Sequence, residues 1–139
     1  MRRRYHIFRR LPLLIEALAA LMLASLLIAV FSFRRVAGVA GRDAAVHQPV
    51  SPPVAQAIDV AIGVWARRVP WRALCFQRGL AAQLMLRRRK LAATLFYGAR
   101  RDEAGTLVAH VWVRSGDVDV TGCEDIANYG LLAAFPSRA

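Results

Sequence analysis

The sequence predicts an α+β domain in which helices come first and a small antiparallel sheet follows. Between residues 54 and 90 the apolar side chains recur at the spacing of two amphipathic helices. Between residues 91 and 136 the pattern changes to short apolar and β-branched runs separated by polar turns. A group of helices followed by a group of strands is typical of the α+β class. The 139 residues leave room for one such domain.

Two helices are expected ahead of the sheet. The first begins at Val54 and ends at Arg67–Arg68, just before Pro70, which stops a helix. The second begins near Cys75 and ends in four cations, Arg87–Lys90. Cations at the C-terminal end of a helix interact favourably with its dipole, and we expect this run to be a solvated helix end.

Three or four strands are expected after these helices. A strand over 91–101 is followed by a polar turn at 102–105, and the alternating segment 106–114 forms the next strand. The dipeptide Ser115–Gly116 then predicts a two-residue hairpin turn into a return strand over 117–122. The segment "YGLLAAFP" closes the chain as the last strand.

An apolar stretch in the N-terminal third, Leu11–Phe33, exceeds the roughly 18 residues that make a membrane span worth considering. Arginines flank it on both sides, so charge asymmetry gives no orientation. Three interpretations stay open: a spanning helix, an interfacial helix held by its arginines, or a helix buried against the domain or a partner. The chain is therefore divided into a basic, apolar helical segment over 1–40, a proline-containing linker over 41–53 and a globular domain over 54–139.

The chain is strongly basic, with 20 Lys and Arg against 9 Asp and Glu, a net charge of +11. Such a surplus suits an acidic peptide, an anionic membrane surface or nucleic acid. The cations stand in short runs at element ends and not along one face between aromatic residues, so we expect no nucleic-acid partner. The two cysteines form no CxxC pair, and no phosphate-binding loop is visible. We therefore expect no metal ion and no cofactor.

The expected hairpin brings an acidic residue next to a histidine. With Ser115–Gly116 as the turn, Trp112 faces Asp119 and His110 faces Thr121. Side chains alternate along a strand, so His110 and Asp119 share a face as diagonal neighbours. Asp119 then lies within reach of a carboxylate–imidazole hydrogen bond to His110.

Cys75, His110 and Asp119 together form a candidate Cys–His–Asp triad. Exposed backbone N–H groups at a helix start stabilise a thiolate and can form an oxyanion hole. A histidine oriented by a carboxylate supplies the base for such a nucleophile. The alternative is that Cys75 and His110 are ordinary core residues. Cys123, close to Glu124, is expected to be structural, because acidic neighbours raise the pKa of a thiol.

Three segments carry a resemblance to known proteins: "RALCFQRGLAAQLMLRRRKLAATLFYGARRD", "LVAHVWVRSGDVDVTGCED" and "YGLLAAFP". They resemble the leader peptidases of lasso-peptide biosynthesis, the split B-type proteins of the transglutaminase-like superfamily. The likeness runs from about Val69 to Pro136, and the apolar segment around residues 9–38 is similar to that family's leading helical segment. It implies a transglutaminase- and papain-like fold, with a helix-borne cysteine packed on a small antiparallel sheet.

The resemblance implies an enzyme that cuts the leader from a ribosomally made precursor peptide by way of an acyl-enzyme. Carried over to this sequence, Cys75 is the nucleophile and His110 the general base and acid. Asp119 is the orienter, although some relatives carry the carboxylate nearer the position of Gly122, and Glu124 is the alternative.

The resemblance also implies partners: the precursor peptide, a separate leader-recognition protein, and the lasso cyclase that uses ATP. Nothing upstream of Leu11 is long enough for the leader-binding domain that some relatives carry, so the split form is expected, with residues 1–40 as a docking site. Two other interpretations are a non-catalytic membrane-associated scaffold and a cysteine acyltransferase. The expected location is cytoplasmic, with membrane contact through residues 11–33 left open.

Overall fold

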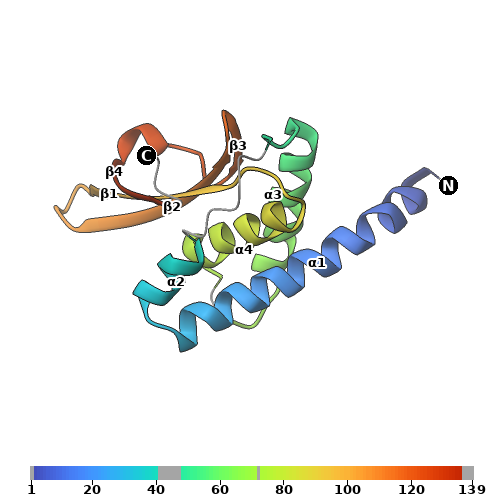
Figure 1. Ribbon diagram of the computed structural model, residues 1–139, viewed down its shortest axis with the longest axis horizontal. Coiled ribbons are helices and arrows are strands. Elements are labelled where there is room, and N and C mark those ends of the chain that lie inside the picture. Colours follow the sequence, from blue (N-terminus) through green and yellow to red (C-terminus); the bar gives the residue numbers. More distant parts are fainter. Residues whose placement is uncertain (1, 41–47, 72, 136–139) are drawn as a thin grey trace.

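The computed structural model describes residues 2–40, 48–71 and 73–135, with side chains from Leu11 on except that of Phe33 (Figure 1). In this described part, four α-helices precede a four-stranded antiparallel sheet. The helices are α1 (Arg2–Val30), α2 (Phe33–Ala40), α3 (Pro52–Ala66) and α4 (Cys75–Arg88). The strands are β1 (Thr94–Arg101), β2 (Leu107–Ser115), β3 (Val118–Thr121) and β4 (Gly130–Phe135), with a 3₁₀ helix at Ile126–Asn128. The expected α+β class is confirmed.

The molecule is built in layers, with α4 between the sheet and α1 (Figure 1). The strand order is β3-β2-β1-β4, so β1 and β2 form the centre of the sheet. Leu95, Val111 and Val113 of these two strands are buried, and Gly79 of α4 lies directly against them. A Cβ atom at Gly79 would lie 2.8 Å from Cγ1 of Val111. This close approach sets the distance between α4 and the sheet. It thereby also sets the position of Cys75, which lies one helical turn before Gly79.

The two predicted helices form, one of them with an earlier start. Helix α4 begins at Cys75, as predicted. Helix α3 begins at Pro52 and not at the predicted Val54. Proline suits the first helical turn because its missing N–H would have no partner within the helix anyway. Pro52 and Pro53, which the sequence pattern assigns to the linker, therefore open the helix. Residues 41–47 of that linker lie outside the described residues, and the three-part division of the chain stays a prediction.

The apolar N-terminal segment forms the long helix α1. One side of α1 packs on α3 and α4 through Ala17, Leu21 and Ala24, which are fully buried. By length and composition, Leu11–Val30 could also cross a membrane, and 22% of that window is buried. Burial against the domain therefore explains why one side of the helix is apolar. It does not explain the apolar residues on the other side.

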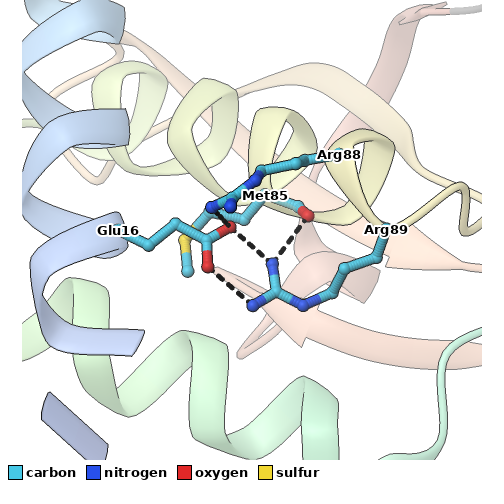
Figure 2. Close-up of polar contacts among 4 residues, drawn as sticks. All are labelled: Glu16, Met85, Arg88 and Arg89. Carbon is cyan, nitrogen blue, oxygen red and sulfur yellow. Dashed lines mark hydrogen bonds and ion pairs between the residues drawn. The ribbon is translucent and has the colours of Figure 1, made fainter. Parts of the chain in front are cut away.

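The basic run after α4 holds two other helices in place, so the expectation of a solvated helix end is wrong for two of its four cations. Arg89 donates to both carboxylate oxygens of Glu16 on α1, at 2.6 and 2.7 Å (Figure 2). Arg88 lies 3.4 Å from the same carboxylate, and most of its side chain stays exposed. Arg87 donates to the last two carbonyl oxygens of α2. The run therefore ties α1 and α2 to α4.

The β2–β3 hairpin has a different register from the expected one. The observed pairs are Ser115↔Val118, Arg114↔Asp119 and Val113↔Thr121, with an irregularity before the last. The turn is therefore Gly116–Asp117, in which Gly116 takes a φ of 58°, a conformation that favours glycine at the first turn position. The predicted turn at Ser115–Gly116, and the facing pairs derived from it, are wrong.

Candidate active site

Cys75 and His110 line the same pocket, a hollow of about 430 Å³ between the start of α4 and the edge of the sheet. Four different elements contribute to its wall. The polar residues that line it with Cys75 and His110 are Asp59, Arg78, Thr121 and Glu124. The structure therefore brings together two of the three predicted site residues, although they are 35 positions apart in the sequence.

Cys75 is the first residue of α4, and its side chain is half-buried. Leu74 precedes it in an extended conformation, and no side chain caps this helix start. The first N–H groups of an α-helix have no partner within the helix and carry the positive end of its dipole. An oxyanion formed next to Cys75 is stabilised at this position for the same electrostatic reason.

His110 projects from β2 and its ring is held on three sides. Its Nε2 atom lies 2.7 Å from the carbonyl oxygen of Gly122. Because a carbonyl oxygen only accepts hydrogen bonds, Nε2 carries the proton in this contact and Nδ1 of the neutral ring is the free base. The rings of Trp112 and Tyr129 lie beside the imidazole, with centroids 6.0 and 5.1 Å away. The contacts therefore select one tautomer and one ring orientation.

The backbone at Gly122 makes the His110 contact possible. Gly122 has a φ of 69°, in the left-handed region that favours glycine. A Cβ atom there would lie 2.7 Å from the carbonyl oxygen of Val111 and 3.4 Å from Nε2 of His110. A side chain at this position would therefore push the chain away from β2 and from the histidine.

Asp119, the predicted third member, lies elsewhere. Its Oδ1 atom accepts a hydrogen bond from Nε of Arg114 at 2.7 Å, and 58% of its side chain is exposed. The register of the hairpin is the physical reason, since Asp119 pairs with Arg114 and not with Trp112. The expectation that Asp119 is a diagonal neighbour of His110 is wrong. Glu124, the alternative, lines the pocket with Cys75 and His110.

Comparison with protein families matches residues 18–133 to the transglutaminase-like superfamily. The chain belongs to the transglutaminase-like superfamily. The match covers well over half of the sequence, and it includes the C-terminal part of α1, α4 with Cys75, and β2 with His110. Members of this superfamily are commonly cysteine peptidases or transglutaminases. Comparisons with curated proteins and with solved structures found no match.

A second hollow of the transglutaminase-like domain extends the site along β3. It has a volume of about 560 Å³ and shares Asp59, Thr121, Gly122 and Glu124 with the Cys75 pocket. Asp117 and Asp119 add to its wall. Together the two hollows, which share four lining residues, form a depression along β3 that is acidic where Asp117 and Asp119 line it, in a chain that is basic as a whole.

Cys123, the second cysteine, is placed as a structural residue. Its Sγ atom lies 3.4 Å from the carbonyl oxygens of Val113 and Thr121. Burial, followed by the charge of Asp119, raises the pKa of the Cys123 thiol from 9.0 to about 11. The expected upward direction is confirmed, with burial as the larger cause. At neutral pH this thiol is therefore a poor nucleophile.

Sequence reasoning missed several residues of this pocket. Arg78 lies one helical turn after Cys75, and that spacing on a helix could have identified it. Asp59 comes from α3, and no local signal links it to Cys75 because only the packing of α3 beside β3 brings it there. Gly122 contacts His110 through its backbone oxygen, which no side-chain pattern indicates, and the resemblance points to this position only as the place where some relatives carry a carboxylate. In the part of the chain that the structure describes, no group of three or more His, Cys, Asp or Glu residues could hold a metal ion.

Proposed function

We propose that this chain is a cysteine peptidase that removes the leader from a ribosomally synthesised lasso-peptide precursor. One observation carries the chemistry: Cys75 at the start of α4 and the oriented ring of His110 line a single pocket. The substrate class is supported by the resemblance of the segments around these two residues to lasso-peptide leader peptidases. The superfamily match supports the cysteine chemistry at a coarser level.

In the first half of the reaction Nδ1 of His110 takes the proton from Sγ of Cys75. The thiolate attacks the carbonyl carbon at the leader–core junction, and the N–H groups at the start of α4 stabilise the oxyanion. When the tetrahedral intermediate collapses, the C–N bond breaks and the histidine returns its proton to the leaving amine. The products are a thioester between the leader and Cys75, and a core peptide with a free N-terminus.

In the second half His110 takes a proton from a water molecule, which attacks the thioester carbonyl. The C–S bond breaks, the leader leaves with a new C-terminal carboxylate, and the proton returns to the sulfur of Cys75. The Gly122 carbonyl orients the ring in both halves, with Glu124 as the candidate carboxylate of the same pocket. The chemistry of these steps needs neither a metal ion nor ATP.

The proposal includes partners. A separate leader-recognition protein delivers the precursor, and a cyclase that uses ATP joins the freed N-terminus to an Asp or Glu side chain of the core. The acidic depression beside the pocket supports a peptide substrate over a small acyl donor, because it extends the site along β3.

The test uses the full chain with a lasso-peptide precursor and a leader-recognition protein, both sought in the gene neighbourhood of the chain. Mass spectrometry should show leader release with the wild type, and loss of release by at least about a thousandfold with Cys75→Ala. Cys123→Ala is the matched control, since this thiol faces β2 and is expected to leave cleavage unchanged. Retained cleavage by Cys75→Ala would refute the peptidase assignment and favour a scaffold.

Acyl transfer is the second candidate, because the same superfamily contains transglutaminases and the thioester chemistry is shared. The two outcomes differ in mass. In ¹⁸O-labelled water, hydrolysis places one heavy oxygen in the released leader, whereas transfer to an added amine yields the amide and no label.

A further inference from the structure

The side of α1 that faces away from the domain is a continuous apolar stripe. Its large side chains are 45–64% exposed and recur at helical spacing over the 20 residues of Leu11–Val30, a length of about 30 Å. The stripe consists of Leu11, Ile15, Met22, Leu23, Leu26 and Val30. Exposed apolar surfaces of this size mark an interaction site in most proteins.

The opposite side of α1 is packed against the domain, which disfavours a spanning orientation in the folded state. Ala17, Leu21 and Ala24 are buried against α3 and α4. Glu16 is fixed by the two hydrogen bonds from Arg89 (Figure 2). If α1 crossed a bilayer in this state, Arg78, Arg87 and Arg88 of α4 would be drawn towards the hydrocarbon with it, at high energetic cost. The packed state of α1 therefore favours an orientation in which the stripe lies along the surface that it contacts.

Charge identifies the partner. Residues 1–40 contain seven arginines and one acidic residue, and that residue, Glu16, is paired with Arg89 on the inner side. Arginines precede the stripe at Arg9–Arg10 and follow it at Arg34–Arg35, where both side chains are exposed. An apolar face with cations at both ends is typical of helices that lie in the interface of an anionic bilayer.

A hollow at the end of the stripe favours lipid over a protein partner. It has a volume of about 390 Å³, lies between α1 and α2, and is lined by apolar residues including Leu27, Phe31 and Val36. Arg35 lines the same hollow, and its guanidinium lies 5.9 Å from the Phe31 ring centroid. An acyl chain below an anionic headgroup matches this combination of an apolar hollow and a cation.

We propose that α1 binds the surface of an anionic membrane, with the stripe in the lipid interface and the arginines at both ends against the headgroups. The site of Cys75 and His110 is not part of this surface, so the proposal does not depend on the peptidase function. In this orientation the domain is a peripheral protein with α1 as its anchor.

The test is sedimentation of the full chain with vesicles. Binding to vesicles with about one third phosphatidylglycerol should exceed binding to pure phosphatidylcholine by about tenfold or more. It should fall steeply at about 1 M salt, where the Debye length is about 3 Å. The double variant Ile15→Glu/Leu26→Glu should reduce binding to anionic vesicles by at least tenfold. The double variant Arg34→Gln/Arg35→Gln should also reduce this binding, but by a smaller factor. Leu107→Glu is the control, because Leu107 on β2 is equally exposed and lies outside the stripe.

Circular dichroism and thermal unfolding of each variant verify that the fold is retained. Equal binding to neutral and anionic vesicles, or unchanged binding of the stripe variant, would overturn the proposal. So would a stripe variant that binds vesicles normally but loses capture of the leader-recognition protein or loses self-association, because the stripe would then be a protein interface.

Discussion

Nε2 of His110 lies 2.7 Å from the carbonyl oxygen of Gly122, where the sequence pattern had placed a carboxylate. A carbonyl fixes the tautomer and the orientation of an imidazole as a carboxylate does. It carries no full negative charge, so it stabilises the imidazolium less. In the proposed mechanism, the rate therefore depends on how well the backbone at residue 122 holds the ring.

Gly122→Ala should disturb this contact. The new Cβ would meet the Val111 carbonyl oxygen at 2.7 Å, and the left-handed φ adds strain of about 1 kcal/mol or more. We expect kcat for leader cleavage to fall by about tenfold or more with little change in KM. Nitrogen NMR of His110 should show loss of the single Nε2-protonated tautomer.

Gly105→Ala is the control for strain alone, because Gly105 has a φ of 78° with open space around it. This variant should lower the free energy of unfolding by about as much as the backbone strain in Gly122→Ala does. It should leave both kcat and the His110 spectrum unchanged. Full activity and an unaltered spectrum in Gly122→Ala would show that the carbonyl does not position the ring.

Gly79→Ala should lift α4 from the sheet. The added Cβ would lie 2.8 Å from Cγ1 of Val111, a stiff side chain. Overpacking of about 1–3 kcal/mol outweighs the roughly 1 kcal/mol that alanine gains over glycine in a helix. Chemical denaturation should therefore show a lower free energy of unfolding, and cleavage should slow because Cys75 moves relative to His110.

Two further variants test the cause of that loss. Val111→Ala in the Gly79→Ala background should restore part of the stability and rate. Gly63→Ala on α3 should be neutral or stabilising, since its Cβ would meet only the ends of two arginine side chains at 3.4–3.5 Å. A stabilised Gly79→Ala would contradict the close packing of α4 on β2.

The two cysteines should differ in their reactivity. Because the Cys123 thiol has its pKa raised to about 11, its alkylation should be slow near neutral pH and rise about tenfold per pH unit until the pH reaches that value. Iodoacetamide at neutral pH should label Cys75 first and abolish cleavage. Peptide mapping by mass spectrometry locates the label, and labelling of Cys123 before Cys75 would contradict the assignment.

The Glu16–Arg89 pair should make stability depend on pH. Burial alone would raise the pKa of the Glu16 carboxyl, but the hydrogen bonds and charge of Arg89, with a smaller contribution from Arg88, lower it below 4.5. A lowered pKa in the folded state means that the stabilisation is present above pH 4.5 and is lost as the pH falls through the folded-state pKa.

Glu16→Gln should therefore cost about 1 kcal/mol near neutral pH and nothing in strong acid. Thermal unfolding as a function of pH measures the difference between the variant and the wild type. Glu103→Gln, in the exposed turn after β1, is the matched control and should change little at any pH. A constant difference across the acid range would show that the ion pair does not stabilise the fold.

Local features of this chain could be predicted because their causes are local. The start of α4 at Cys75 follows from the spacing of apolar residues after a proline-containing turn, and the sheet strands follow from β-branched runs. The early start of α3 at Pro52 does not follow from these patterns, because consecutive prolines indicate a linker as readily as the first turn of a helix.

Patterns within the sequence are enough to predict the α+β class, the helix that carries Cys75, the strand that carries His110 and the apolar helix at the N-terminus. Which side chains meet depends instead on strand register and helix packing. The hairpin turn lies one residue later than the sequence pattern predicts, with Gly116 at a positive φ. In the resulting register Asp119 pairs with Arg114, and His110 contacts the carbonyl oxygen of Gly122. Packing of α1 likewise gave Arg89 its partner in Glu16. Strand register and helix packing bring together residues that are far apart in the sequence. A local sequence pattern cannot predict them, because the free energy that favours one register or packing comes from these long-range contacts.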